Sequence, residues 1–568
     1  MIQSEKTFFP IFWAFSILSF NLILSQSVFV PINADYQHLI DRIEIKSGKL
    51  SNQLFTVHKG YSRADIIELL DSCTNDTLLA WSKKDNFNIS YLYDDNWEWS
   101  NRGNSDKALL KVLYTKKNAF YTVNRPDFIF MINPILYLTL GKDRHENSKI
   151  LYQNTRGFEL RGWLDKKIGF YAMITENQAL FPSFARINDS VPLVYGENYS
   201  KKKPSNPNVA DFLSARGYLN AAIMPSWTIQ FGHDKNFIGN GFRSILLSDH
   251  SGSYLFLRSL AKVWKFQYMN IFAQMTATPT IVDSYYRKKY FAMHHLSINI
   301  TKFINIGFFE IVNFGRPQQQ VFDLNYLNPV IFYRSIEQNL GSYDNAMLGF
   351  DSKINFLKRF SFYSQVLLDE FLISKFREQK GDWVNKQAIQ LGLKYIDVFS
   401  IKNLDFLAEF NLIRPFVYQH LDLERSHSHY LQPLAHPLGA NLKEFAYVIR
   451  YQPMNRLFVS YKLIINKQGI DSINSVWNVG ADVRKSYIYK IFPNGPGTTT
   501  GHKVGQGIDK HLIMHNLTVS YMFKHNLFAD FLLIYRNVDS KQFSSIKTQN
   551  LIYSVGIRFN ITKREYDF

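Results

Sequence analysis

Few groups of side chains in this sequence have the types and spacing that predict chemistry. The glycine-rich residues 495–503 superficially resemble a phosphate-binding loop. However, His502 stands where such a loop needs Lys after its last glycine, and the flanking segments have the pattern of strands rather than of a following helix. We therefore interpret this stretch as a flexible surface loop.

Four histidines lie close together in the sequence and are candidate metal ligands: His420, His427, His429 and His436. They lack the spacing of an HExxH-type motif, and imidazoles in a proline-bounded loop more often bond to their neighbours. Carboxylates such as Asp283, Asp369 and Glu370 form no pair whose sequence spacing predicts a glycosidase, because that geometry depends on separation in space. We expect no enzyme activity, no metal site and no cofactor.

The composition restricts the class of protein. The chain has 568 residues, a formal net charge of +18, 46% hydrophobic residues and 16% aromatic residues, which excludes a disordered chain. Its single cysteine, Cys73, excludes an internal disulfide framework and a cysteine-rich metal site. No nucleic-acid-binding module accompanies the positive charge, so an acidic polysaccharide is the better-fitting partner, with an ordinary solvated surface as the alternative.

Residues 1–25 have the pattern of an export signal, with Lys6 ahead of a long apolar run and small residues near position 25. Pro10 and the polar end of this run favour cleavage near Gln26 over an uncleaved anchor. No later window of 18 or more apolar residues appears, which excludes a helical inner-membrane protein. A secreted or periplasmic protein and a transmembrane β-barrel remain.

From about Asp127 onward the sequence forms segments of roughly ten alternating residues, the length of a tilted strand that crosses a bilayer. In one such segment Leu391 and Leu393 alternate with Gln390 and Lys394. A soluble β-sandwich also alternates, but its polar face looks onto water, so charge rather than small and amide side chains should gather there. The pattern favours a membrane barrel.

Short turns and long polar loops alternate between these segments, as in outer-membrane barrels. Eight hairpins and a lone strand at each end predict an antiparallel barrel of about 18 strands. The expected short turns are residues 165–167, 225–227, 261–263, 301–303, 357–359, 400–403, 453–456 and 524–526, and the longest expected loops are residues 177–216, 315–343, 414–443 and 466–510. Aromatic residues beside the turns predict an interfacial girdle: Trp227, Trp264, Phe303, Phe360, Phe399 and Phe523.

Residues 26–115 lack the alternation and form a separate segment ahead of the barrel, which we assign to residues 116–568. Ser62 and Asp65 resemble a capping box in front of a helical apolar pattern, and a second helix is expected over residues 77–81. We predict a partly helical periplasmic segment that caps the inner mouth of the barrel.

Several long motifs carry a family resemblance. They are residues 230–249 (QFGHDKNFIGNGFRSILLSD in part), residues 36–42 (YQHLIDR), residues 328–334 (NPVIFYR) and residues 432–441 (QPLAHPLGAN). With these motifs the chain resembles the Wzi-like capsule-assembly family of outer-membrane proteins. It is most similar to the branch found in Bacteroidetes bacteria, which includes the gliding-motility protein RemB.

The resemblance implies an 18-stranded outer-membrane barrel that acts as a non-enzymatic surface lectin, binding and helping to anchor or assemble capsular polysaccharide or exopolysaccharide. The expected partners are surface polysaccharide and outer-membrane lipid, with gliding or export machinery as further partners. The alternatives are a role in gliding or adhesion, and a diffusion channel. A surface glycosidase is the enzyme-class alternative.

Residues 234–249 run from the end of a strand into a loop opposite the short turns, which makes their polar side chains candidates for glycan binding. The alternative is that this segment folds inward and plugs the pore through its own Asp–Arg pairs. The candidate glycan-binding residues, to which the same ambiguity applies, are Asp234, Lys235, Asn236, Arg243, Asp249, Tyr333, Arg334, Arg414 and Tyr418.

Overall fold

The structure, a computed structural model, describes residues 27–100, 102–105, 109–146, 150–186, 193–198, 200–203, 206–282, 285–316, 321–472 and 475–568. The predicted export signal at residues 1–25 lies outside the described residues, as does Asp283.

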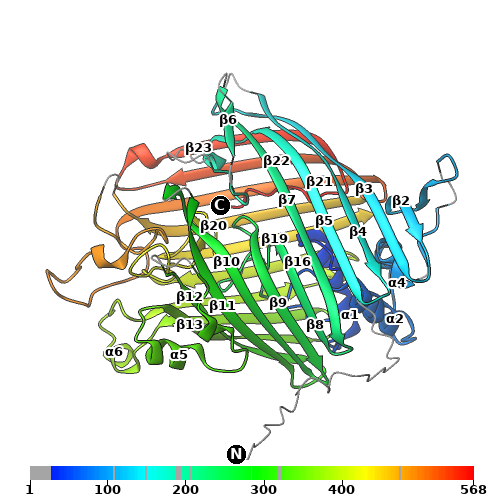
Figure 1. Cartoon of the computed structure of the whole chain (residues 1–568). Helices are drawn as coiled ribbons and strands as arrows, with labels where there is room; N and C mark the ends of the chain where they lie inside the picture. Colours follow the sequence, from blue (N-terminus) through cyan, green and yellow to red (C-terminus); the bar gives the residue numbers. More distant parts are fainter. Residues whose placement is uncertain are drawn as a thin grey trace, which may run out of the picture.

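Within the described chain, eighteen antiparallel strands form a closed barrel (Figure 1). Each strand pairs with the next, and the last pairs with the first, from Ile552 opposite Asp143 to Phe559 opposite Leu136. The predicted strand number is therefore confirmed. The barrel strands are β3 (Phe128–Asp143), β4 (Ile150–Leu164), β5 (Ile168–Leu180), β7 (Asn206–Met224), β8 (Trp227–Asp234), β9 (Tyr254–Val263), β10 (Phe266–Val282), β11 (Tyr285–Asn299), β12 (Ile304–Phe314), β13 (Asn345–Phe356), β14 (Phe360–Glu370), β15 (Lys386–Tyr395), β16 (Leu404–Ile413), β19 (Leu442–Met454), β20 (Leu457–Ile470), β21 (Ile508–Lys524), β22 (Leu527–Asp539) and β23 (Thr548–Phe559).

Short connections lie at one end of the barrel and long loops at the other (Figure 1). The turn expected at residues 261–263 is wrong, because these residues continue β9 and the chain turns at Trp264 and Lys265. The loop expected at residues 177–216 is too wide, since Asn177 pairs with Phe212 in the β5–β7 ladder. The polar composition of these residues predicted a loop. The strands nevertheless continue through them, because they extend beyond the length that a bilayer needs.

Minor elements belong to the connections. They are β1 (Leu113–Lys116), β2 (Ala119–Asn124), β6 (Lys201–Lys203), β17 (Ser428–His429), β18 (Gln432–Pro433), α5 (Tyr333–Leu340), α6 (Ile373–Arg377) and the short 3₁₀ helices η1 (Ser183–Ala185), η2 (Leu324–Leu327), η3 (Val398–Ser400), η4 (Tyr487–Tyr489) and η5 (Ser544–Ile546).

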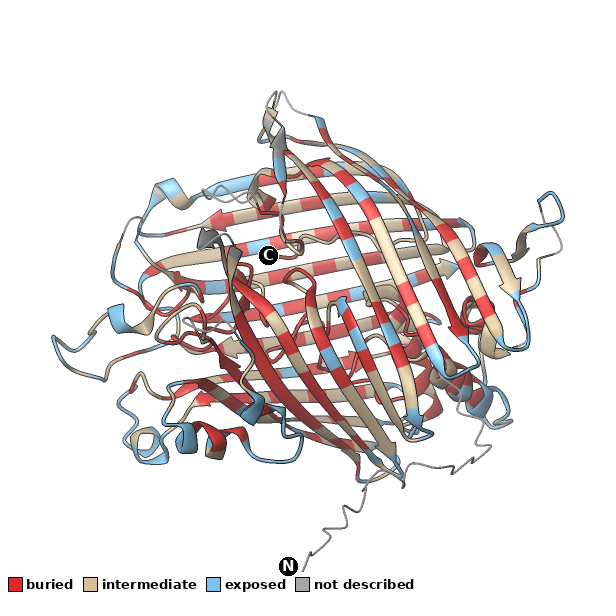
Figure 2. Cartoon of the chain, in the orientation of Figure 1, coloured by how far each residue is buried: buried red, intermediate tan, exposed pale blue. Residues whose placement is uncertain are grey.

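The barrel wall exposes apolar side chains on its outer face and buries polar side chains on its inner face, which is the reverse of a soluble protein. On β15, Leu391 is 42% exposed and points outward, whereas Gln390 is fully buried inside. On β23, Val555 is exposed and Arg558 is buried. Figure 2 shows this alternation of exposed and buried residues around the wall. An apolar outer face over closed strands is the pattern of a barrel in lipid.

Aromatic side chains gather at the turn end of the wall. Trp264 and Phe399 beside the turns are largely exposed, and Phe303 and Phe523 are about half exposed. This is the position of an interfacial girdle. None of the helices in the described ranges has both the length and the apolar composition that a membrane-spanning helix needs.

Four helices occupy the turn end of the barrel: α1 (Ala34–Ser47), α2 (Arg63–Thr74), α3 (Lys83–Asp95) and α4 (Trp97–Ser100) (Figure 1). They share an apolar core that includes Ile40, Ile66 and Leu92. Ser62 caps α2 as expected, by accepting a hydrogen bond from the Asp65 backbone. The helix expected over residues 77–81 is wrong, because the complete capping box is Ser82 with Asp85, which begins α3 after that stretch.

A charge placed on the outer face tests the membrane orientation of the wall. We expect Leu391→Arg, near the middle of β15, to lower the free energy of unfolding by about 2–4 kcal/mol, since an arginine there faces hydrocarbon. The measurement is urea unfolding in phosphatidylcholine bilayers. Leu372→Arg, at an exposed position beyond β14, is the control and should change stability much less. Equal effects at the two positions would contradict the assigned orientation.

Candidate functional site

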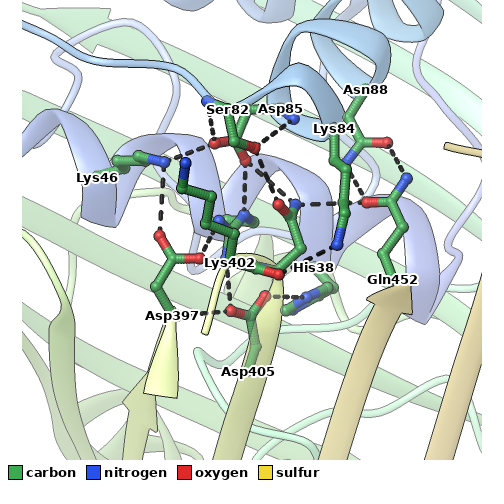
Figure 3. Close-up of polar contacts among 12 residues, drawn as sticks. His38, Lys46, Ser82, Lys84, Asp85, Asn88, Asp397, Lys402, Asp405 and Gln452 are labelled. Atoms are coloured by element: carbon green, nitrogen blue, oxygen red, sulfur yellow. Dashed lines mark hydrogen bonds and ion pairs between the residues drawn. The ribbon is translucent and has the colours of Figure 1, made fainter. Parts of the chain in front are cut away.

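The lumen of the barrel holds the polar groups of this protein, and α1 closes it at the turn end. The Arg42 guanidinium contacts three carboxylates: Asp85 of α3 at 3.0 Å, Asp397 beside η3 at 2.6 Å, and Asp405 of β16. His38 donates a hydrogen bond from Nε2 to the Asp405 carboxylate at 2.9 Å, in the network of Figure 3. Burial alone would raise the pKa of Asp85, but Arg42 and Lys46 hold that pKa well below its ordinary value.

A second buried charge cluster joins α1 to the barrel wall. Lys394 of β15 donates to Asp41 at 2.7 Å, and Lys353 of β13 contacts Glu44. Lys59 lies 4.0 Å from Asp41. Burial lowers the pKa of Lys59 to about 7. These contacts hold the N-terminal segment inside the mouth of the barrel.

Loops from the opposite end also fold into the lumen. Ile245, Leu246 and Leu247 are fully buried against inward-facing wall residues such as Phe291 and Met293. The segment after β8 therefore folds inward, as in the plugging alternative. Its arginine, Arg243, contacts carboxylates of the wall rather than the aspartates of its own segment.

Arg243 shows how this inward loop is held. Its guanidinium donates to Glu444 of β19 at 3.0 Å, and its backbone N–H donates to Glu409 of β16 at 3.0 Å. His436 contacts the same Glu444 at 3.1 Å. Arg243 and His436 are thus both held by the buried carboxylate of Glu444 on the barrel wall.

Residues 560–568 turn back from the end of β23 into the lumen. Lys462 of β20 donates to Glu565 and to Asp567, at 2.6 Å each. Arg536 donates to the Phe568 carbonyl at 3.1 Å, and the Phe568 ring lies 4.5 Å from that of Tyr195. Sequence reasoning missed this luminal segment, because its partners are spread over strands far away in the chain.

Between α1, the inward loops and residues 560–568, the lumen retains a cavity of about 510 Å³. It is lined by α1 toward the turn end and by residues 195–197 and 248–250 toward the loop end, with residues 560–568 alongside. Charged side chains of both signs line it, and most of the acidic ones stand beside Arg or Lys. Glu197, for example, accepts from Arg564 at 2.8 Å.

Several donors around the cavity lack partners. The Nε atoms of Arg216 and Arg450 and the Nε2 atom of His250 are buried with no hydrogen-bond partner among the described residues. All three residues line the cavity. A buried polar nitrogen that has no partner costs free energy, so these positions favour a ligand or water that completes their hydrogen bonds.

Electrostatics at the loop end of the cavity favour an anion or a hydroxyl-rich ligand. Burial and the neighbouring Arg216 lower the pKa of Lys235 to about 8, which leaves the ammonium largely charged at neutral pH. Burial lowers the pKa of His250 to about 3, so its imidazole is neutral. Arg216 and Lys235 thus present charged donors, and the neutral imidazole of His250 adds an uncharged donor or acceptor.

The structure brings together only part of the predicted glycan-binding set. Asp234, Lys235, Arg243 and Asp249 line the cavity, and Lys235 donates to the Asp249 carbonyl at 2.9 Å. The remaining five lie elsewhere among the described residues. Asn236 is buried against Tyr254 and Arg258, Tyr418 donates to the Ile245 carbonyl, Arg414 donates to the Asp382 carbonyl, and Tyr333 and Arg334 begin α5 outside the barrel wall.

Sequence reasoning missed Glu197, Arg216 and His250 of the cavity. Arg216 belongs to β7, where the sequence predicts a loop, and no motif marks the other two. The four clustered histidines do not share a site; His427, for example, contacts the Leu246 carbonyl at 2.7 Å and Asn313 at 3.2 Å. Among the described residues no group of three or more His, Cys, Asp or Glu side chains has an arrangement that could hold a metal ion.

Closed strands with an apolar exterior and a polar, loop-filled lumen define an eighteen-stranded outer-membrane β-barrel. No protein-family profile matches the chain, and no curated protein is significantly similar to it. Among solved structures, it is similar to Wzi, described as an outer-membrane protein involved in group 1 capsule assembly in Escherichia coli and as a carbohydrate-binding β-barrel. That match has a TM-score of 0.57 and 12% identity, and it covers 94% of this chain and 100% of Wzi.

Weaker matches include OprD of Pseudomonas aeruginosa, with a TM-score of 0.41, 9% identity and coverage of 76% of this chain and 94% of that one. OccAB2 of Acinetobacter baumannii has a TM-score of 0.41, 10% identity and coverage of 76% and 97%. The likeness to Wzi is one of fold, and it supports a Wzi-like barrel. The Bacteroidetes branch of that family stays a prediction.

Removal of Arg42 tests how the N-terminal segment is held. We expect Arg42→Ala to destabilise its docking by about 3–5 kcal/mol, because three buried or half-buried carboxylates lose their shared cation. Hydrogen exchange of α1 should rise in the variant. Lys49→Ala, which removes a 62%-exposed lysine paired with Asp76, is the matched control and should cost less than about 1 kcal/mol. Unchanged exchange in α1 would refute this role of Arg42.

Proposed function

We propose that this chain is a non-enzymatic outer-membrane protein that binds surface polysaccharide and helps to anchor or assemble it at the cell. The observation that carries the proposal is the luminal cavity, where the buried donors of Arg216 and His250 have no partner among the described residues. The likeness of the whole fold to Wzi, which is described as a carbohydrate-binding β-barrel, adds support.

The loop end of the cavity has the chemistry that an acidic sugar needs. Arg216 and Lys235 supply positive charge for a carboxylate, and neutral His250 supplies a donor or an acceptor for hydroxyls. Tyr195 and Phe568 place aromatic rings on the same lining, and aromatic faces are suited to the apolar faces of sugar rings. We therefore assign an acidic segment of the polysaccharide to this end.

The electrostatics of Glu197 support binding rather than glycoside hydrolysis at this carboxylate. Burial would raise the pKa of Glu197, but Arg564 and Arg216 lower it below its ordinary value. A glycosidase needs one carboxyl group whose raised pKa keeps it protonated as a general acid. The pKa of Glu197 is lowered instead, so we propose no hydrolytic role for it.

A role in gliding motility or adhesion remains the alternative function, in which the same glycan contacts would serve movement or attachment. A diffusion channel has less support, because helices, inward loops and residues 560–568 fill much of the lumen.

The titration of Lys235 gives binding a defined pH dependence. An acidic polymer binds the charged ammonium, so affinity should be nearly full at pH 7 and below, and fall as the pH rises through about 8. We expect a loss of about tenfold between pH 7 and pH 9.5, equivalent to ~1.4 kcal/mol. Calorimetry with purified protein and surface polysaccharide isolated from the parent cells measures it.

Lys235→Arg keeps its charge over this range and should flatten the profile. Lys541→Arg, at an exposed loop position, is the control and should leave the profile as in the parent protein. The same fall in affinity in Lys235→Arg and in the parent protein would rule out Lys235 as the titrating contact.

Retention of polysaccharide by cells tests the function itself. In a strain that lacks the protein, we expect polysaccharide to move from the cell-bound pool to the medium at constant total. Complementation with Arg216→Ala/Lys235→Ala should restore the protein in the outer membrane but not the bound pool. Arg377→Ala/Lys380→Ala removes the same charge from exposed positions in the connection between β14 and β15, and should restore both. If neither pool changes in the deletion strain, motility or adhesion becomes the better-supported function.

A further inference from the structure

The outer wall of the barrel carries a polar patch where lipid would be expected. Asn270, His294 and Glu310 stand side by side on β10, β11 and β12, in register with Leu348 of β13. Leu348 is 49% exposed on the outer face, whereas the next residue to His294, His295, contacts His58 in the lumen. The three polar side chains therefore point away from the lumen.

The connection between β12 and β13 covers this patch. The Pro329 carbonyl accepts from Asn270 at 3.2 Å, and the Ile331 carbonyl contacts His294 at 3.0 Å. At the start of α5, the backbone N–H groups of residues 333 and 334 donate to the Glu310 carboxylate at 2.8 and 3.0 Å. Glu310 thus caps the N-terminus of α5 from the barrel wall.

Apolar packing holds the same segment against the wall. Tyr326 and Tyr333 are fully buried and pack with Phe314 and Val312 of β12. The Tyr333 ring also stacks on His294, with ring centroids 3.9 Å apart. Residues 321–341, which we term the wall segment, are thus a folded layer on the outside of the barrel.

The opposite side of the wall segment carries large apolar side chains that nothing in the described chain covers. Leu324, Val330 and Phe332 are 74%, 80% and 77% exposed. Residues 324–332 contain no charged side chain. This surface continues into the exposed apolar residues of the adjoining wall, such as Phe308 and Leu348.

The position of the patch along the strands puts it at membrane depth. Asn270 lies close to the start of β10 and His294 close to the end of β11, so both are nearer to the turn end than to the loop end. With a strand rise of about 3.3 Å per residue, residues 329–334 reach well down the wall from the loop end. Irregular backbone at such a depth requires partners within the protein, which Asn270, His294 and Glu310 provide.

We propose that the wall segment is embedded in the membrane and that its exposed face contacts lipid acyl chains. Its occupant is lipid rather than water or a second protein, because the face is uncharged and continuous with the lipid-facing wall. The polar patch is then the anchor that lets a non-strand segment lie in the bilayer. This inference is independent of polysaccharide binding.

Spin labelling of the full chain in phosphatidylcholine vesicles tests the proposal. In a Cys73→Ser background, which removes the single buried cysteine, nitroxides are attached at Phe332→Cys and, separately, at Val330→Cys. Collisions with oxygen and with a water-soluble nickel chelate are then compared. We expect both labels to show frequent oxygen collisions and few nickel collisions, as a lipid-facing site does.

Two matched sites calibrate the result. Leu348→Cys marks the lipid-facing wall, and Val476→Cys, 68% exposed in the loop between β20 and β21, marks water. Labels at positions 330 and 332 that follow Val476 would overturn the proposal. Spectral broadening that disappears on dilution with unlabelled protein would also overturn it, because it would identify a second copy as the occupant. The folded barrel is verified in every variant by its heat-modifiable mobility in gel electrophoresis.

Discussion

Closure of the sheet by the pairing of β23 with β3 is the interaction on which the rest of this structure depends. In a bilayer, every backbone N–H and C=O of a strand needs a partner, and only a closed sheet supplies one at both edges. Once the sheet is closed, the two-residue period of each strand separates the side chains into a lipid face and a luminal face. Leu391 and Gln390, adjacent in sequence, therefore lie in opposite surroundings.

That separation concentrates polar and charged groups in a confined lumen. Buried charges are stable only when they are paired and hydrogen-bonded, and the segments that fill the lumen supply the pairs. Arg42 of α1 reaches carboxylates of the turn end, Glu444 of the wall receives Arg243 from an inward loop, and Lys462 receives Asp567. A large share of the charge in this basic protein thus serves to dock its helices, loops and residues 560–568 within the barrel.

The candidate site is the cavity that remains between the helices, the inward loops and residues 560–568. At its loop end, Arg216 and His250 retain donors without partners among the described residues, whereas comparable groups such as Arg243 are fully engaged. This contrast is the reason why we propose the loop end of the cavity as the binding position. Polar groups on the outside of the barrel are also paired. Backbone groups of the wall segment bond to Glu310 and His294, so that these side chains do not face hydrocarbon without a partner.

The sequence by itself determined the barrel. Alternation over about ten residues, short turns alternating with long loops and aromatic residues beside the turns predicted eighteen strands and their orientation, because these features depend only on local period and composition. Strand ends were predicted less well, as at Val263 and Asn177, because ladder pairing continues into polar residues.

The site was decided by the tertiary structure. Lys235 and Asp249 were found because they lie in one charged motif, but Arg216, Glu197 and His250 join them only through the folding of separate segments into one lumen. Arg243 and Tyr333 have side chains as suited to a glycan as that of Lys235, yet one is bound to Glu444 and the other is packed on the outer wall. Whether a polar side chain binds a ligand or a neighbour depends on which distant residues surround it, and local sequence does not contain that information.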